Sequence, residues 1–433
     1  MAHQKSLKLT AFLMASTLSS MSYGAGFAII EQSVTGLGRA FAGSAAVAED
    51  ASTIFFNPAG LTYLSNSELA AGLNLIRPKS DFSNRGSNAP ALGGALLSGD
   101  GDDAGELGIV PNLYYAHRLN DSMVAGIGVN APFGLVTDYS DSWVGRYHGI
   151  RSDLKTININ PSFAFKANEK LSLGAGISLQ YIDLQLTQAV DFGTICASVP
   201  LAACAGPQSN DGKVNLEADD WSWGYNLGVI FQATEATRLA LAYRSKISHT
   251  LTGNGTITQV STGTIVADGN IDGQVALPES ASFAIHHQIN DKWAVMGDAS
   301  WTRWSRFKEL AINSDGTLPS SSKPENWENT MRYGLGLSYD HNDKWAFRAG
   351  VAYDETPISD EFRTPRIPGE DRTWVAVGAT YKYSEHITVD AGYTHIFVSD
   401  PKINDVDANG YTLTGEYDAS VDILGVQMRW LFL

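Results

Sequence analysis

The sequence predicts an all-β membrane protein, a 14-stranded antiparallel outer-membrane β-barrel with a small N-terminal hatch of short helices plugging its lumen. Three features support this fold class. Apolar and polar residues alternate in one segment after another, short polar turns alternate with long loops, and a Gly- and Ala-rich stretch precedes the first strand. Alternating strands joined by short turns on one side and long loops on the other are typical of barrels that span the outer membrane.

The start of the chain is expected to be a secretory signal peptide. Lys5 and Lys8 precede a short apolar run, and small residues lead to a cleavage site before Ala25. Such a run is too short to cross a membrane as a helix, and no later apolar run is long enough to do so. We therefore expect three parts: the signal peptide 1–24, the hatch 25–66 and the barrel 67–433.

The expected hatch is a small, tightly packed segment. Residues 35–64 are rich in Gly and Ala and contain a tight turn at Asn57-Pro58-Ala59. The run GLGRAFAG at 36–43 resembles a phosphate-binding loop, but it lacks the full G-x-G-x-x-G pattern and follows no strand of a βαβ unit. We interpret it as packing inside the barrel.

The remaining chain divides into seven hairpins. Each predicted strand alternates apolar and polar residues over about the 9–11 positions that cross a bilayer. Long Gly-, Ser- and Asp-rich loops are expected at 192–215, 253–270, 312–324 and 357–371. The strands are expected to start near residues 67, 108, 122, 152, 170, 213, 236, 271, 292, 325, 344, 372, 386 and 418.

The last strand shows the pattern most clearly. Its lipid-facing row is predicted to be Leu424, Val426, Met428, Trp430 and Phe432, with Gly425, Gln427 and Arg429 pointing inward. We expect the barrel to close, because lipid offers no hydrogen bonds to a free sheet edge. A soluble β-sandwich or β-helix is the alternative fold.

The third strand contains an irregularity at Asn130, Ala131, Pro132, Phe133 and Gly134. Pro132 has no backbone N–H and cannot complete a ladder hydrogen bond. Two interpretations stay open. The strand is broken at mid-depth, which directs polar backbone into a cavity or opens a gap in the wall. Alternatively, the strand ends early and Pro132 lies in a loop.

Other kinds of site receive little support. The net charge of −16 argues against a nucleic-acid partner. Cys196 and Cys204 lie in one loop and are expected to form a disulfide, since no nearby His completes a metal site. No hydrolase, P-loop or zinc-protease motif occurs, so we expect no enzymatic activity, no cofactor and no metal. An outer-membrane hydrolase assembled across strands stays an alternative.

Taken together, these segments resemble the outer-membrane long-chain fatty acid transporter family, which includes importers of aromatic and other hydrophobic hydrocarbons. The resemblance covers essentially the whole mature chain. The residues that carry it are Ala25-Gly26-Phe27, Gly36-Leu37-Gly38-Arg39-Ala40, Glu49-Asp50-Ala51, Asn57-Pro58-Ala59, APFGL at 131–135, YRS at 243–245, SWTRWSRFKEL at 300–310 and PGEDRTWVAVG at 368–378.

The resemblance implies uptake of long-chain fatty acids or similar hydrophobic compounds in the outer membrane of a Gram-negative bacterium. Substrate would bind inside the barrel, the hatch would rearrange, and the molecule would leave sideways at a kink in the third strand. Expected partners are the hydrophobic substrate, outer-membrane lipid and lipopolysaccharide, and the chain is expected to be a monomer. The implied hatch and gating residues are Phe27, Gly36, Gly38, Arg39, Asn57, Pro58 and Ala59, and the implied kink is Asn130 to Gly134.

The ligand-binding candidates are Phe27, Ile29, Gln188 and Arg332. A fatty acid carboxylate needs a cationic partner when buried. By the resemblance, basic positions of the family align here with Gln188 and Glu328. Arg332, Lys382 and Arg429 are expected to point inward and could substitute for them, or could instead pair with inner carboxylates such as Asp340 or Asp390. Neutral hydrophobes therefore stay open as substrates. The alternative function is a general diffusion porin, against which the hatch and the Gly-rich inner faces argue.

Overall fold

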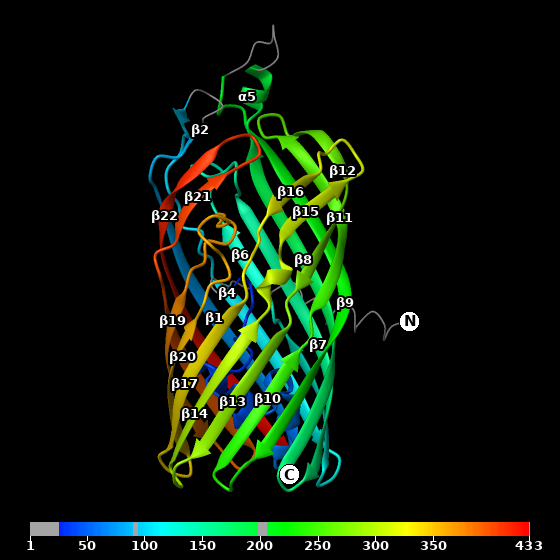
Figure 1. The fold of residues 1–433 in the computed structure, drawn as a ribbon, viewed down its shortest axis with the longest axis vertical. Coiled ribbons are helices and arrows are strands. Elements are labelled where there is room, and N and C mark those ends of the chain that lie inside the picture. Colours follow the sequence, from blue (N-terminus) through cyan, green and yellow to red (C-terminus); the bar gives the residue numbers. More distant parts are fainter. Residues whose placement is uncertain (1–25, 90–93, 198–205, 433) are drawn as a thin grey trace.

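The computed structural model describes residues 26–89, 94–197 and 206–432. It is a tall barrel with short turns at one end and long extensions at the other, and the first described residues lie inside its lower half (Figure 1). By the loop lengths, the short turns are periplasmic and the extensions extracellular. The predicted signal peptide and Cys204 lie outside the described residues.

Fourteen strands of the described chain form a closed antiparallel barrel, which confirms the predicted fold class. The first strand pairs with the last from Ser67↔Phe432 to Asn84↔Gly415. The third strand has two parts, β5 and β6. The barrel strands are β1 (Ser67–Asn84), β4 (Gly108–Arg118), β5 (Met123–Asn130) with β6 (Gly134–Asp138), β7 (Arg151–Asn168), β8 (Leu171–Val190), β9 (Gly212–Gln232), β10 (Thr237–Arg244), β13 (Ser280–Gln288), β14 (Trp293–Thr302), β17 (Thr330–Asp340), β18 (Trp345–Asp354), β19 (Arg372–Lys382), β20 (Ile387–Val398) and β22 (Thr412–Phe432).

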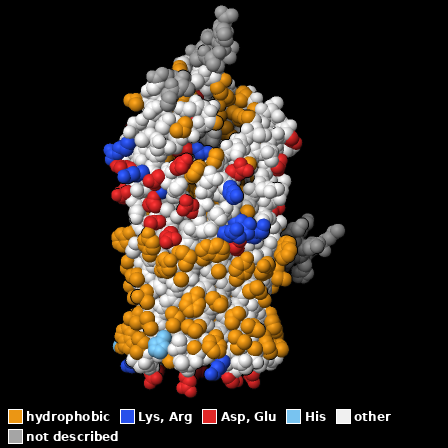
Figure 2. All heavy atoms as spheres, in the orientation of Figure 1, with side chains coloured by type: hydrophobic (Ala, Val, Ile, Leu, Met, Phe, Trp, Pro, Cys, Tyr) orange, Lys and Arg blue, Asp and Glu red, His pale blue; other side chains and the backbone are white. Residues whose placement is uncertain are grey.

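The outward row of β22 is the predicted one. Leu424, Val426 and Phe432 are 52%, 53% and 44% exposed, whereas Gln427 is buried. Figure 2 shows the apolar side chains of all visible strands as a belt around the lower half, below an extracellular half rich in charged side chains. None of the helices in the described residues has the length and apolar character that crossing a membrane requires.

The extracellular extensions are more regular than predicted. The eighth and tenth barrel strands start at Ser280 and Thr330, after hairpins that occupy the predicted loops 253–270 and 312–324. These hairpins stand above the membrane, so they lack the apolar outer row that marks the barrel strands. The extracellular elements are β2 (Asn88–Ala89), β3 (Ala95–Leu96), α5 (Phe192–Ala197), β11 (Ile247–Gln259), β12 (Thr264–Leu277), η3 (Trp304–Arg306), β15 (Glu309–Ser314), β16 (Ser321–Pro324) and β21 (Lys402–Val406).

The hatch consists of four short helical segments, α2 (Val34–Leu37), α3 (Ser44–Val47), α4 (Thr53–Phe56) and η1 (Pro58–Tyr63). The turn predicted at Asn57 begins η1: its Oδ1 accepts from Ala59 N (3.0 Å), and its Nδ2 donates to Ala45 O (2.8 Å). Polar side chains thus cap helices too short to be stable alone.

Small residues let the hatch approach the barrel wall. A Cβ added to Gly378 on β19 would lie 2.7 Å from Cα of Gly38, and one added to Gly38 would lie 2.8 Å from Cα of Gly378. The space that inward glycines leave in this wall is therefore filled by hatch backbone, and any side chain at either position would push the two apart.

Candidate ligand-binding and gating site

A cavity of about 170 Å³ lies between the hatch and the barrel wall, and we call it the inner cavity. The hatch contributes apolar side chains to its lining, namely Ala28, Ile29, Ile30, Phe41, Phe55 and Phe56. The barrel adds apolar groups such as Leu227, Ala242 and Trp374, and a polar side of hydroxyl and charged groups. A cavity with this lining suits an apolar molecule with one polar end.

Arg332, a predicted ligand-binding residue, lies on the polar side of the inner cavity. Its Nη2 donates to Ala40 O of the hatch, and its Nη1 lies 3.7 Å from Asp298 Oδ2. Its guanidinium carbon is 5.4 Å from the centre of the Trp374 ring. Nε and Nη1 have no hydrogen-bond partner among the described residues. Arg332 therefore contacts both hatch and cavity.

A second, smaller cavity of about 50 Å³ lies towards the extracellular extensions, and we call it the outer cavity. Its wall is mainly leucine, isoleucine, valine and phenylalanine side chains from β6, β7, β8, β12 and β15 and their loops. Phe27 contributes to this wall, whereas its neighbours Ala28 and Ile29 line the inner cavity. The first described residues of the chain thus lie between the two cavities.

Phe27 is held by aromatic rings on every side. Its ring centre lies 5.0 Å from that of Trp304, 5.7 Å from those of Phe307 and Trp327, and 6.0 Å from that of Phe133. Only 2% of Phe27 is exposed. The pairs with Trp304 and Phe307 are edge-to-face, and each pair of this kind adds about 0.5–1.5 kcal/mol to the burial of the ring.

One ring of this aromatic group depends on a buried acid. Trp327 Nε1 donates to Glu325 Oε2 at 3.1 Å, and Glu325 is 6% exposed. Burial raises the pKa of Glu325 to about 7, although the Trp327 hydrogen bond and the charge of Lys323 oppose this. The outer cavity therefore has a carboxyl group that titrates near neutral pH.

The irregularity in the third strand is a break within the strand and not an early end. β5 pairs with β7 as far as Asn130↔Asn158, and β6 resumes the pairing at Gly134↔Lys155. The first four residues of β6 are all buried, whereas β5 alternates between exposed and buried positions. The strand therefore bends inward at Ala131, Pro132 and Phe133.

The hatch supplies hydrogen bonds to this kink. The amide of Gln32 pairs with both backbone groups of Ala131: Nε2 donates to its carbonyl (2.7 Å) and Oε1 accepts from its N–H (3.3 Å). Ile29 N donates to Pro132 O, and Gly134 N donates to Phe27 O, each at 2.9 Å. Buried backbone groups need such partners, so the kink and the start of the hatch form one hydrogen-bonded unit.

The kink leaves a gap in the hydrogen-bonded ladder of the barrel wall. The ladder between β4 and β5 ends at Leu113↔Val129, and β6 pairs with β7 alone among the described strands. Residues 108–112 of β4 therefore have a partner strand on their β1 side and none on the β6 side in the described chain. Residues 27–32 lie against the inner side of this gap, where Tyr114 Oη of β4 donates to Gln32 O (3.0 Å) and Asn74 Nδ2 of β1 donates to Glu31 O (2.8 Å).

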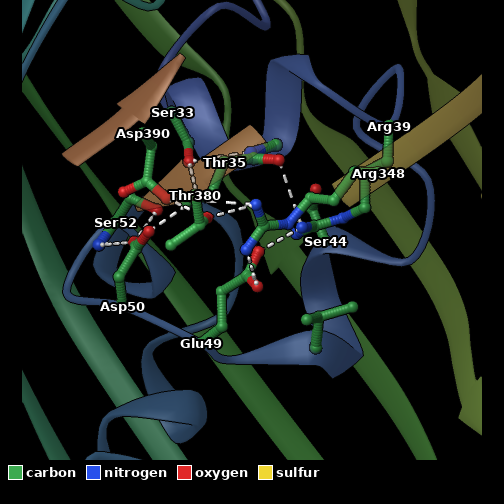
Figure 3. A network of polar contacts seen from close by, with 12 residues as sticks. Ser33, Thr35, Arg39, Ser44, Glu49, Asp50, Ser52, Arg348, Thr380 and Asp390 are labelled. Atoms are coloured by element: carbon green, nitrogen blue, oxygen red, sulfur yellow. Dashed lines mark hydrogen bonds and ion pairs between the residues drawn. The ribbon is translucent and has the colours of Figure 1, made fainter. Parts of the chain in front are cut away.

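The middle of the hatch is held in place by charged side chains. Glu49 lies between two guanidiniums, Arg39 of the hatch and Arg348 of β18 (Figure 3). The Arg348 contact measures 3.0 Å. Burial alone would raise the pKa of Glu49, but Arg348, Arg39 and Arg429 hold it well below its usual range. Glu49 is thus ionised at every physiological pH.

Neighbouring charges extend this contact to the last barrel strands. Arg429 Nη1 donates to Glu49 O (3.3 Å), and its Nε donates to Asp390 Oδ2 (2.8 Å). Asp50 accepts hydrogen bonds from Thr35 (2.6 Å) and Gln427 (3.0 Å). This part of the hatch is therefore attached to β18 and β22, and Asp390 of β20 holds the Arg429 side chain in place.

The other predicted site residues lie as follows. Gly36 packs against the Phe41 ring, and Pro58 and Ala59 lie against Gly174 and Gly228 of the wall. Gln188 is outside the inner cavity: its Oε1 accepts from Arg366 Nη2 at 2.8 Å among the extracellular extensions. The pairing of Cys196 with Cys204 stays a prediction.

Comparison with known proteins identifies the fold family. The family described as "Outer membrane protein transport protein (OMPP1/FadL/TodX)" matches residues 15–432. The chain belongs to this family. The predicted resemblance and the outer-membrane location are thereby confirmed.

Relatives within the OMPP1/FadL/TodX family cover nearly the whole chain. The long-chain fatty acid transport protein of Salmonella typhi is 30% identical over 404 residues, covering 90% of this chain and 91% of the relative. Outer membrane protein P1 of Haemophilus influenzae is 33% identical over 419 residues, covering 90% and 89%.

Solved structures of similar proteins have the same fold as this chain. A FadL homologue of Pseudomonas aeruginosa superposes with a TM-score of 0.87 at 25% identity, covering 94% of this chain and 100% of the homologue. The Ralstonia pickettii toluene transporter TbuX, at 20% identity, has a TM-score of 0.67 over 94% of this chain and 99% of its own. This second likeness shows the fold alone.

Proposed function

We propose that this protein takes up long-chain fatty acids or similar hydrophobic compounds across the outer membrane. The observation that carries the proposal is the position of residues 27–32. They separate the two apolar cavities and at the same time complete the hydrogen bonds of the kink. One displacement of this segment would join the cavities and uncover the gap between β4 and β6. The names of the relatives support the substrate class.

Transport begins with capture at the outer cavity. An apolar chain entering there meets the aromatic group around Phe27, whose side chain blocks the way inward. The apolar surface of the substrate takes the place of the Phe27 ring against the surrounding aromatic side chains. Displacing Phe27 therefore costs little free energy. It then occupies the inner cavity, where Ile29, Ile30 and Phe41 provide an apolar wall.

Release is sideways at the kink. The gap beside β6 opens towards lipid, so a hydrophobic molecule leaves without crossing an aqueous lumen. No covalent bond changes. The substrate shifts the hatch between two positions by binding one of them better, which is the only way a ligand can move such an equilibrium. Monomeric state and contact with lipopolysaccharide stay predictions.

A disulfide across the hatch and kink tests this proposal. Ala28 and Phe133 are paired as an isolated antiparallel bridge, a geometry in which two cysteines can join. We expect an Ala28→Cys/Phe133→Cys variant, in a background with Cys196→Ser and Cys204→Ser, to lose oleate uptake when oxidised and to regain it on reduction.

Both single-cysteine variants are the controls, because they alter the same side chains without the cross-link. Uptake is measured with oleate and with a neutral hydrocarbon of similar length in cells that lack their own transporter. Equal uptake by the oxidised and reduced double variant would show that displacement of residues 27–32 is not needed, and would exclude the proposed route.

A further inference from the structure

Three guanidinium groups line the inner cavity, and they differ in their charge balance. Arg332 faces Asp298 at 3.7 Å, and Arg372 forms an ion pair with Asp354. Arg244, on β10, forms no ion pair with any carboxylate of the described residues. The cavity therefore contains two compensated cations and one uncompensated cation.

The contacts of Arg244 are all uncharged. Its Nη2 donates to Phe55 O at 2.8 Å and its Nη1 to Ser178 Oγ at 3.4 Å. Its guanidinium carbon lies 4.3 Å from the centre of the Phe55 ring. A cation inside a protein is costly when no anion balances it. An anionic group that reaches Arg244 would remove this cost.

Neighbouring strands build a polar recess around this side chain. Arg244 is in register with Asn226 on β9 and with Ser280 on β13, and all three residues line the inner cavity. Asn226 Nδ2 already donates to Ile54 O at 3.1 Å, which fixes the amide. The rings of Phe55 and Phe56 line the same cavity. A ligand with a polar head and an apolar tail could therefore place its head in the recess and its tail against these rings.

We propose that Arg244 binds the carboxylate of an acyl ligand in the inner cavity. The inference rests on the proposed uptake function and specifies its substrate class: an anionic amphiphile with a terminal carboxylate, in preference to a neutral hydrocarbon. The planar fork of a guanidinium matches the two oxygens of a carboxylate and holds them with paired charge-assisted hydrogen bonds. In the bound state these donors turn from Phe55 O and Ser178 Oγ to the ligand.

The inference gives a role to a sequence feature that had none. The YRS run at 243–245 contributes to the family resemblance but carried no predicted function. Its arginine lines the inner cavity from β10, and β13 and β14 separate this strand from β17, which carries Arg332. Ser245 follows the last residue of β10, and its Oγ accepts a hydrogen bond from Tyr225 N of β9 at 2.9 Å.

The test compares two ligands of equal length, oleate and oleyl alcohol. Equilibrium binding of each radiolabelled ligand is measured on the purified full-length protein in lipid nanodiscs. A hydrogen-bonded charge contributes enough that Arg244→Gln is expected to weaken oleate binding by about tenfold or more. Oleyl alcohol binding is expected to change by less than about twofold. Arg244→Lys keeps the charge and is expected to lose less oleate affinity than Arg244→Gln.

Arg238→Gln is the matched control. Arg238 lies on the same face of β10 and also supports the hatch through uncharged contacts, with Nη1 donating to Val47 O at 2.9 Å and its guanidinium 4.8 Å from the Tyr63 ring centre. It does not line the inner cavity. A loss of hatch support alone would affect both arginine variants, whereas loss of carboxylate binding affects Arg244→Gln only.

Several results would overturn the inference. The first is an oleate affinity in Arg244→Gln equal to that of the wild type. The second is an equal loss of affinity for oleate and oleyl alcohol, and the third is an oleate-specific loss of affinity found only in Arg332→Gln. Each would exclude the role of Arg244 and leave the proposed uptake function unaffected. Failure of the wild-type protein to bind either ligand would instead overturn the proposed function, and the inference with it.

Discussion

The first residues of the hatch and its middle are held by different forces. Residues 27–32, the tip, contact the kink through aromatic rings and uncharged hydrogen bonds. Residues 39–50, the base, are attached to β18 and β22 through Glu49 and Asp50, and Arg39 pairs with Glu49 within the base. An uncharged hydrogen bond contributes about 1 kcal/mol, whereas removing one member of a buried ion pair costs about 3–5 kcal/mol. Under the proposed uptake route, we therefore expect the tip to be displaced more readily than the base.

The largest effect is expected at the base. Glu49→Gln leaves the guanidiniums of Arg39 and Arg348 without their shared carboxylate, which should weaken docking of the hatch by about 3–5 kcal/mol. We expect raised ionic conductance in planar bilayers and faster proteolysis of the hatch. Glu235→Gln, at an exposed periplasmic turn, is the control. Wild-type conductance in Glu49→Gln would contradict the role of the base.

A smaller effect is expected at the tip. Gln32→Leu leaves the N–H and carbonyl of Ala131 without their partner, at a cost of about 1–3 kcal/mol. Hydrogen exchange at residues 131–134 should accelerate while exchange at residues 44–50 stays unchanged. Gln185→Leu removes a comparable amide from the extracellular surface and should affect neither segment. Equal acceleration in both segments would show that tip and base open together.

The stability of the tip and that of the base should also depend differently on pH. The pKa of Glu325 beside the tip is raised to about 7, so the folded state binds more protons than the unfolded state between its ordinary pKa of 4.5 and 7. The stability of this region therefore falls as pH rises through that interval. The pKa of Glu49 is lowered, so its contribution is present throughout this range and is lost only in stronger acid.

We accordingly expect hydrogen exchange near residues 325–328 to be faster at pH 8 than at pH 6, after correction for intrinsic rates, with no change at residues 44–50. Glu325→Gln mimics the protonated acid and should remove the difference. A persistent difference in that variant would assign the titration to another group.

The smallest effect is expected from Pro132→Ala. The bend is already held by Gln32, by Ile29 and by Thr156, whose Oγ1 accepts from Phe133 N (3.0 Å). One additional N–H does not restore the ladder, because three residues separate β5 from β6. Oleate uptake should stay within about twofold of wild type. A severalfold loss would show that the proline itself maintains the gap.

The barrel was predictable because lipid imposes a strict rule. Every second residue of a membrane strand faces hydrocarbon, so the outward row ending in Trp430 and Phe432 is visible in the sequence. The extracellular hairpin of β11 and β12 was missed because no such rule applies above the membrane. Its Gly-, Thr- and Asn-rich sequence has the composition of an irregular loop.

The site was only partly predictable. Pro132 marks the kink because proline cannot pair in a ladder, and Phe27 and Arg39 follow from the family resemblance. Gln32 has no comparable signal, and the YRS run that contains Arg244 marks the family but not the role of the arginine, since the partners of the two side chains are backbone groups 99 and 189 residues away. A side chain that pairs with distant backbone leaves no spacing or motif for sequence reasoning to detect.

The spread of hatch contacts along the chain has a consequence for how the protein is assembled. Residues 26–63 leave the ribosome before any barrel strand, yet Gln32 needs Ala131, Glu49 needs Arg348 and Asp50 needs Gln427. The last of these partners exists in place only once β22 has paired with β1 and the wall has closed. The segment that is synthesised before the strands is therefore the last to reach its position, and until then its apolar side chains require protection from the periplasm.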